Sequence, residues 1–223
     1  MKIFLLLHFA CQMVTEIGGT LVDNVEEATH VIASDIVLGR RVNVKAPLRR
    51  TPKLMAALCV IDNIVDKRWL SESAKNGNPE PPENYLVNDT EAEEKYKMVL
   101  RDSIARSKIM REEENRRLLS GYSVYIIKGV DGVNTRTHKT PKLEDFKMMI
   151  NAAGGKLLRQ DELYERPTKN TDYSKFIIIT SKLEDEKKKQ LREKYVKDAI
   201  KDGARDVDTE TFFDSFMRQQ LLF

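Results

Sequence analysis

The sequence predicts an α/β protein made of two similar units. Of its 223 residues, 41% are hydrophobic and 33% are charged, which is typical of a globular protein with a large solvated surface. Short apolar runs typical of buried strands alternate with amphipathic stretches typical of helices. Related motifs recur in the same order in both halves. Because such strands usually form a parallel sheet covered by helices on both faces, we expect two such sheets.

The first unit is expected to begin with a strand over residues 2–6. The following segment reads as a helix that ends at Gly18 and Gly19, where glycine suits a left-handed C-cap. The apolar start also resembles a signal peptide, but His8 interrupts it and no small-x-small cleavage site follows. We therefore favour a buried strand.

Three pairs of motifs define an internal repeat. Each pair shares its pattern of glycines, apolar runs or helix starts: "VTEIGGTLVD" (14–23) with "INAAGGKLLR" (150–159), "ATHVIAS" (28–34) with "SKFIIITS" (174–181), and "IVDKRWLSES" (64–73) with "DVDTETFFDS" (206–215). The common order is strand, helix, strand, strand, helix, strand, helix. A repeat of this kind indicates two copies of one supersecondary unit.

The break between the copies is rich in turn-forming residues. "KNGNPEPPENY" ends the first unit, so we place unit 1 at 1–78, a linker at 79–119 and unit 2 at 120–223. Within the linker, 90–119 reads as one long helix. Thr90 and Glu93 match a capping box at its start.

The stretch "LRRTPKLMAALC" predicts a helix with an unusual start. Thr51 is a good N-cap and Pro52 a good first residue. Arg49, Arg50 and Lys53, however, place three cations at the positive end of the helix dipole. Each exposed cation there costs about 0.3–1 kcal/mol. A bound anion would reverse the sign of that cost.

The same cations end a basic loop. Residues 39–50 carry five basic residues and no acidic one, although the net charge of the whole chain is only +3. A solvated loop explains this pattern, and so does a focused anion-binding surface. Direct DNA binding through Arg40–Lys53 is one such possibility.

Taken together, these motifs resemble a tandem BRCT pair. The Gly-Gly after the first helix, "THVIAS", "RTPK" and "RWLSES" carry the resemblance. It implies two BRCT units, each a small four-stranded parallel sheet flanked by helices, packed in tandem through a helical linker. It places Trp69 in the core. It also implies a non-enzymatic module of a nuclear DNA-damage-response scaffold.

The resemblance further implies a phosphoserine-peptide site. Lys53 and Thr51 would hold the phosphate, Arg50 would grip the peptide backbone or its terminal carboxylate, and Glu210 would line the peptide groove. The expected partner is the gamma-phosphorylated histone tail that marks DNA damage. Each residue also has an ordinary structural role available: helix cap, solvated cation or first-turn glutamate.

Two features depart from the family pattern. Phosphate-binding relatives usually carry Ser-Gly or Thr-Gly after the first strand, yet residues 1–13 contain no Ser, Thr or Gly. His8 could substitute, or the pair could be a phosphate-independent interaction module. In the second unit, Thr211 stands at the position of Trp69, and Phe212 and Phe213 are expected to fill the core instead.

Other classes of site find little support. No GxSxG, HExxH, Walker or GxGxxG pattern occurs, and the two cysteines lack zinc-ligand spacing, so we expect no catalytic centre, metal or cofactor. The "EEATH" stretch reads as a surface turn, and "KTPK" (139–142) as an ordinary helix start. No apolar run approaches the roughly 18 residues that span a membrane.

Overall fold

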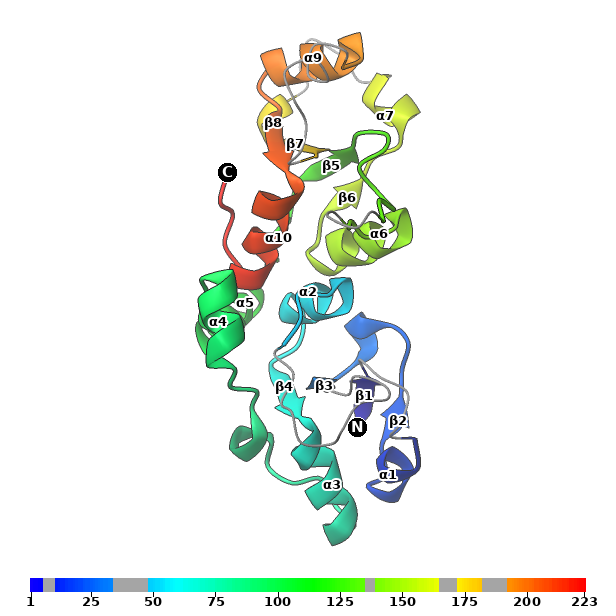
Figure 1. The fold of residues 1–223 in the computed structure, drawn as a ribbon, viewed down its shortest axis with the longest axis vertical. Coiled ribbons are helices and arrows are strands. Elements are labelled where there is room, and N and C mark those ends of the chain that lie inside the picture. Colours follow the sequence, from blue (N-terminus) through cyan, green and yellow to red (C-terminus); the bar gives the residue numbers. More distant parts are fainter. Residues whose placement is uncertain (6–10, 34–47, 135–138, 165–171, 182–191) are drawn as a thin grey trace. The chain divides into compact units, whose positions relative to one another are not determined.

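The computed structural model describes residues 1–5, 11–33, 48–134, 139–164, 172–181 and 192–223. Contacts between Cα atoms divide the chain into two compact units, one of residues 1–115 and 217–219, the other of residues 116–216 and 220–223 (Figure 1). The linker of the sequence analysis thus groups largely with the first unit. His8 and most of the basic loop, including Arg40, lie outside the described residues.

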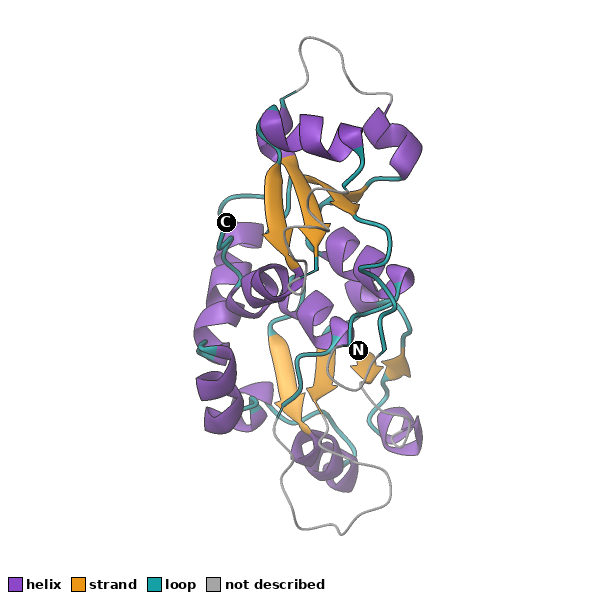
Figure 2. Cartoon of the chain, turned by 45° about the horizontal axis from the view of Figure 1, so that its top comes forward, coloured by secondary structure: helices purple, strands orange, loops and turns teal. Residues whose placement is uncertain are grey.

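The first unit is a four-stranded parallel sheet with the order β2-β1-β3-β4 (Figures 1 and 2). Its elements in chain order are β1 (Lys2–Leu5), α1 (Cys11–Glu16), β2 (Thr20–Leu21), η1 (Val25–Glu27), β3 (His30–Ala33), α2 (Pro52–Leu58), β4 (Asn63–Asp66), α3 (Lys67–Asn76) and η2 (Pro82–Tyr85). Apart from the short 3-10 turns, this is the predicted alternation. The α/β class with parallel sheets is confirmed.

Trp69 lies in the core of the first unit, as expected. Its side chain is fully buried, and its indole N–H donates to the Glu80 carbonyl oxygen at 2.8 Å. The His30 ring stacks on it with centroids 4.9 Å apart. This arrangement ties α3 to β3 and satisfies the one polar atom of the indole.

The paired glycines end the first helix of each unit in the same way. Gly18 and Gly154 have φ angles of 68° and 77°, which favour glycine at a helix C-terminus. The next glycine is needed for space, because a Cβ at Gly19 would lie 3.0 Å from the side chain and carbonyl oxygen of Val14. The repeat in the sequence is therefore a repeat of backbone geometry.

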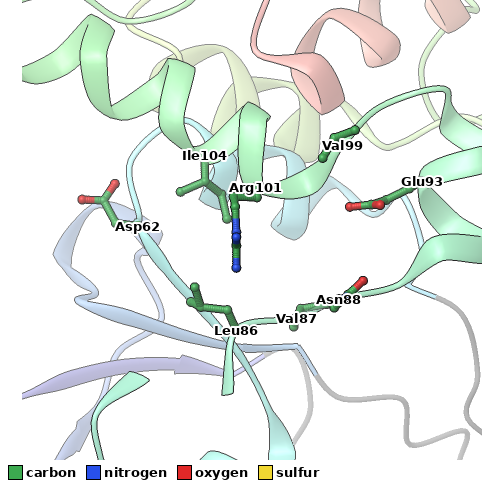
Figure 3. A pocket seen from close by; sticks show the side chains of 8 residues that line it. All are labelled: Asp62, Leu86, Val87, Asn88, Glu93, Val99, Arg101 and Ile104. Atoms are coloured by element: carbon green, nitrogen blue, oxygen red, sulfur yellow. The ribbon is translucent and has the colours of Figure 1, made fainter. Parts of the chain in front are cut away.

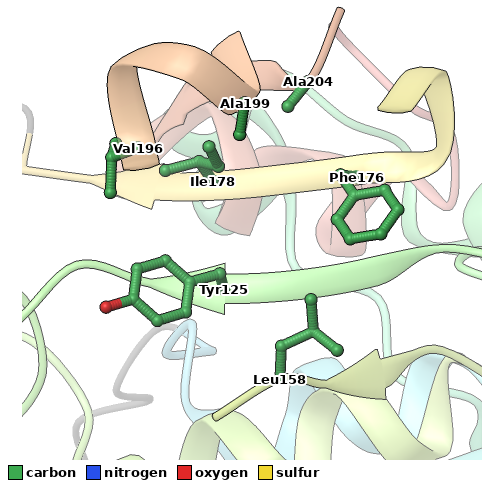
Figure 4. Packing of buried hydrophobic residues seen from close by; sticks show 7 residues of the cluster. All are labelled: Tyr125, Leu158, Phe176, Ile178, Val196, Ala199 and Ala204. Atoms are coloured by element: carbon green, nitrogen blue, oxygen red, sulfur yellow. The ribbon is translucent and has the colours of Figure 1, made fainter. Parts of the chain in front are cut away.

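The second unit repeats the sheet, with the order β6-β5-β7-β8 and all strands parallel (Figure 2). Its elements are β5 (Ser123–Ile126), α6 (Leu143–Ala152), β6 (Lys156–Leu157), α7 (Gln160–Tyr164), η3 (Tyr173–Lys175), β7 (Phe176–Thr180), α9 (Lys194–Lys201), β8 (Arg205–Asp208) and α10 (Thr209–Arg218). One face of this sheet packs a cluster that includes Tyr125, Phe176 and Ile178 against α9 (Figure 4).

Aromatic residues fill the other side of the second core. Phe212 and Phe213 are buried, and their rings lie 6.4 and 5.7 Å from that of Phe146 on α6. Both α3 and α10 begin directly after a capping aspartate, so Thr211 does occupy the helix position of Trp69. The expectation that the two phenylalanines replace the tryptophan is confirmed.

The linker differs from its prediction as a single helix. It forms α4 (Thr90–Tyr96) and α5 (Leu100–Glu112), separated at Lys97, whose φ is 49°. The capping-box prediction is also wrong, because Asp89 caps α4 by accepting the Ala92 N–H at 3.0 Å. The Glu93 carboxylate instead accepts the Leu100 N–H at 2.8 Å and so begins α5.

The "KTPK" stretch ends at the N-cap of α6, as predicted: Lys142 is the N-cap residue, and its backbone N–H donates to the Asp145 carboxylate at 3.3 Å. Thr140 accepts the Val133 N–H at 2.9 Å and donates to the Val130 carbonyl oxygen at 2.5 Å, so it closes the preceding turn. Within the described parts of the chain, no helix is long and apolar enough to cross a membrane. Those same parts hold no group of three or more His, Cys, Asp or Glu side chains placed to share a metal ion.

Candidate functional site

The start of α2 is built as the sequence indicates. Thr51 has an extended backbone, and its hydroxyl oxygen accepts the Leu54 N–H at 3.2 Å. Pro52 begins the helix, and all residues from Leu54 to Leu58 are buried. The N-cap prediction is confirmed. The burial of these residues, rather than the dipole of this short helix, therefore stabilises the start of α2.

Lys53 lies beside the first strand. Its ammonium nitrogen is 5.3 Å from the ring centroid of Phe4, a buried residue of β1. The rest of the lysine is exposed. A cation over an aromatic face gains about 0.5–1 kcal/mol at an exposed site, which is comparable to the cost of a cation at a helix start.

Arg50 is held by the linker. Its guanidinium carbon lies 5.6 Å from the ring centroid of Tyr96 at the end of α4, and its backbone N–H donates to the Tyr96 hydroxyl at 3.2 Å. The ammonium of Lys95 lies 5.3 Å from the same centroid. Two cations therefore share one aromatic ring, which concentrates positive charge next to α2.

Leu48, two residues before Arg50, makes a second contact with the start of α4. The Leu48 N–H donates to the Asp89 carboxylate at 2.6 Å, and this buried carboxylate also caps α4. Residues 48–50 are thus fastened to α4 at two points, by Asp89 and by Tyr96. No local sequence pattern predicts either contact. Aspartate is a favoured N-cap residue, but no local sequence signal pairs Asp89 with Leu48.

Three of the four predicted site residues therefore lie together. Arg50, Thr51 and Lys53 form one short segment, in which one cation precedes the capping threonine and one follows it along the chain. Two of the three cations at the helix start, Arg50 and Lys53, have aromatic partners in Tyr96 and Phe4. These two cations make the surface at the start of α2 electropositive.

Glu210 belongs to the second unit. It lies in the first turn of α10, where its backbone N–H donates to the Asp208 carboxylate at 2.8 Å. Its side chain is partly exposed. Its predicted part in a peptide groove stays a prediction. The segment 6–10, where the resemblance leads one to expect a phosphate-binding hydroxyl, lies outside the described residues.

The curated relatives of the chain include mediator of DNA damage checkpoint protein 1 and PAX-interacting protein 1. The chain is 35% identical to mouse mediator of DNA damage checkpoint protein 1 over 117 residues, or 52% of its length, and 34% identical to the rat protein over 145 residues, or 65%. It is 26% identical to bovine PAX-interacting protein 1 over 167 residues, or 74%. The matches span only 6%, 9% and 14% of these three relatives. No protein-family model matches the chain.

Solved structures establish the architecture. The BRCT5-BRCT6 domains of S. pombe Brc1 match 99% of this chain and 93% of their own, with a TM-score of 0.69 and 15% identity. Rtt107p, in a complex with a phosphorylated histone, matches all of this chain and 88% of its own, with a TM-score of 0.57 and 11% identity. The fold is that of a tandem pair of BRCT domains. The predicted resemblance to the pair of the checkpoint mediator and to fungal scaffolds is confirmed.

Proposed function

We propose that this chain is a non-enzymatic phosphoserine-peptide-binding module of a nuclear DNA-damage-response scaffold. Its partner in this proposal is the gamma-phosphorylated C-terminal tail of a histone. The fold, the names of the curated relatives and the histone-bound Rtt107p support this assignment. The observation that carries it is that two cations with aromatic partners, Arg50 and Lys53, flank the Thr51 cap in the chain at the start of α2.

The phosphate would be held by Lys53 and Thr51. Lys53 offers three N–H donors on a flexible stem, which suits a dianionic phosphate. The Thr51 oxygen already accepts the Leu54 N–H, so its hydroxyl hydrogen remains available to a phosphate oxygen. The same residue can therefore cap the helix and bind the ligand.

The peptide beyond the phosphate would be held by Arg50. A planar guanidinium binds a carboxylate through two parallel hydrogen bonds. Tyr96 restricts this side chain before the ligand arrives, which lowers the entropy lost on binding. The carboxylate in question is the terminal one, three residues after the phosphoserine. Glu210 would line the groove from the second unit.

The test is fluorescence anisotropy with a labelled histone-tail peptide and its unphosphorylated twin. We expect binding only to the phosphopeptide, and we expect Lys53→Gln to lose that preference. Lys75→Gln, which removes another exposed lysine of the same unit, is the matched control and should bind like the unchanged protein.

Two other outcomes would contradict the proposal. Equal affinity for both peptides would indicate a phosphate-independent interaction module. Tight binding to duplex DNA that falls steeply with salt, together with indifference to phosphoserine, would indicate a nucleic-acid-binding function for the basic segment.

A further inference from the structure

The outermost strands of the two sheets, β4 and β8, can be compared residue by residue. Each leads directly into a helix through a capping aspartate, Asp66 in the first unit and Asp208 in the second (Figure 1). The register with the neighbouring strand makes Ile64 of β4 the counterpart of Asp206 of β8. An outermost strand exposes one row of backbone N–H and C=O groups unless another segment covers it.

In the first unit, the segment after η2 covers the outer edge of β4. Leu86 forms an isolated antiparallel bridge with Val65, and the Val87 N–H donates to the Ile64 carbonyl oxygen at 3.0 Å. Leu86, Val87 and Asn88 follow one another along this segment (Figure 3). Leu86 also packs against the core cluster that contains Val65. The first unit thus shows what such an edge binds, namely a short antiparallel segment with an aliphatic side chain.

In the second unit, no segment of the described chain covers the corresponding edge. Alternate residues of a strand point their backbone groups to the same side, so the Asp206 C=O and the Asp208 N–H face outward. Within the described residues, neither group bonds to the backbone of a segment outside the sheet, and β8 has no counterpart of the bridge to Leu86. Thr211 is partly exposed where its counterpart Trp69 is fully buried, which agrees with the missing cover.

The chain after α10 leaves this edge accessible. Ser215 accepts the Gln220 N–H at its carbonyl oxygen (3.1 Å) and the Leu222 N–H at its hydroxyl (3.2 Å). Ser73 on α3 makes the same pair of bonds in the first unit. The chain after α10 therefore starts along the path of residues 78–81. Because that path coexists with a covering segment on β4, it does not block the edge of β8.

The charged side chains of β8 already have partners. Asp206 is ion-paired with Arg192 at 2.7 Å, Asp208 caps α10, and Arg205 donates to the Phe223 carbonyl oxygen at 2.8 Å. Charges on an edge strand usually discourage pairing with another chain. Here they are engaged within the unit, so the edge offers backbone groups without an unpaired charge beside them. An uncharged segment is the complementary ligand.

We propose that the outer edge of β8 binds an uncharged, extended segment of a partner protein as an added antiparallel strand. A backbone N–H of the partner would donate to the Asp206 carbonyl oxygen, and an aliphatic residue one position earlier would contact Val207. Leu86 and Val87 make these contacts in the first unit. The residues proposed to hold the phosphate belong to the other unit. The edge is therefore independent of the proposed phosphopeptide function and would give a scaffold a second contact point.

The test uses a peptide probe that copies the covering segment of the first unit. Acetyl-Asn-Tyr-Leu-Val-Asn-amide, the uncharged sequence of residues 84–88, is titrated into the ¹⁵N-labelled full chain and followed by NMR. We expect the probe to shift the amide signal of Asp208 and to slow its hydrogen exchange. The amide signal of Asp66, on the strand edge that is already covered, should stay unchanged.

Two methylated probes form a matched pair. N-methylation of the probe's valine removes the donor to Asp206 and should weaken binding about fivefold. N-methylation of its leucine should change the affinity little, because that N–H points away from the strand in this register. Replacing the probe's leucine with asparagine should weaken binding about tenfold, since the aliphatic contact is lost.

A variant of the phosphate site separates the two proposals. Lys53→Gln should leave probe binding intact, even though it abolishes phosphopeptide binding. The absence of any shift, equal weakening by both methyl groups, or shifts confined to residues outside β8 would each overturn the proposal for the edge. Exchange protection of Asp208 that rises with protein concentration in the absence of the probe would also overturn it, because it would assign the edge to a second copy of this chain.

Discussion

At the scale of single residues, aromatic rings decide how the charged side chains of the site are held. Lys53 rests beside Phe4, and Arg50 shares the ring of Tyr96 with Lys95. These contacts come from β1 and α4, which are distant in sequence from "RTPK". They let the helix start tolerate its cations without a ligand, and they keep the cations oriented for one.

The role of Arg50 can be tested by changing the C-terminus of the phosphopeptide. A phosphopeptide with a free C-terminus should bind about tenfold more tightly than its amidated form, since a hydrogen bond to a charged group contributes about 1.5–3 kcal/mol. Arg50→Gln should reduce that ratio toward one. Equal affinity of the free and amidated peptides for the unchanged protein would exclude the carboxylate role.

Tyr96 should act by positioning Arg50. Tyr96→Phe keeps the ring but removes the hydroxyl that accepts the Arg50 N–H. We expect Tyr96→Leu to reduce the ratio between free and amidated peptides further than Tyr96→Phe does, because the leucine also removes the cation–π contact. Isothermal titration calorimetry with the free and the amidated peptide measures this affinity ratio for each variant. Unchanged ratios in both variants would show that Tyr96 is only structural.

His30 makes stability depend on pH. Burial and, to a smaller extent, the N-terminal ammonium lower the pKa of His30 below its ordinary value of 6.5, while Glu83 acts in the opposite direction. The unfolded chain then binds more protons than the folded one just below pH 6.5, so stability falls as the pH drops through that range. His30→Gln should flatten this dependence. Urea unfolding at several pH values, followed by fluorescence of the single tryptophan, tests it.

At the scale of elements, one carboxylate joins two parts of the first unit. Asp89 caps α4 and accepts the Leu48 N–H just before α2. The helix that carries Lys53 and the helix that carries Tyr96 are thereby placed by the same residue. The geometry of the candidate site thus depends on the linker as well as on the BRCT repeat itself.

Asp89→Ala should therefore affect both stability and binding. Loss of an N-cap costs about 0.5–2 kcal/mol, and a buried N–H left without an acceptor costs about 1–3 kcal/mol. Asp66→Ala, which removes the cap of α3 and an exposed ion pair with Arg68 within that helix start but no bond to another element, is the control. Chemical denaturation should show a larger loss for Asp89→Ala. A smaller loss than in Asp66→Ala would contradict the double role of Asp89.

At the scale of the whole molecule, each unit has its own sheet and its own core. Trp69 fills the first core and the group around Phe212 fills the second. The two halves share the backbone geometry of the repeat, while their large aromatic residues occupy different helix positions.

A core defect in the second unit should be visible there first. Phe212→Ala removes a fully buried ring, which costs about 3–5 kcal/mol. Hydrogen exchange measured by mass spectrometry should show faster exchange in β5 and β7 than in the unchanged protein. If exchange increased first in β1 and β3 instead, the assignment of Phe212 to the second core would be wrong.

The sequence by itself determined the class of fold, the repeat and the start of α2. Those features depend on local signals: apolar strands, paired glycines at helix ends, and a Thr-Pro helix start. Only the tertiary structure decided the break at Lys97, the anchoring of Arg50 by Tyr96, and the double contact of Asp89. The reason is physical. A left-handed residue inside a helical pattern, a cation–π contact between residues 46 positions apart, and a carboxylate that bonds both Leu48 and Ala92 arise from packing between elements, which local sequence patterns do not record.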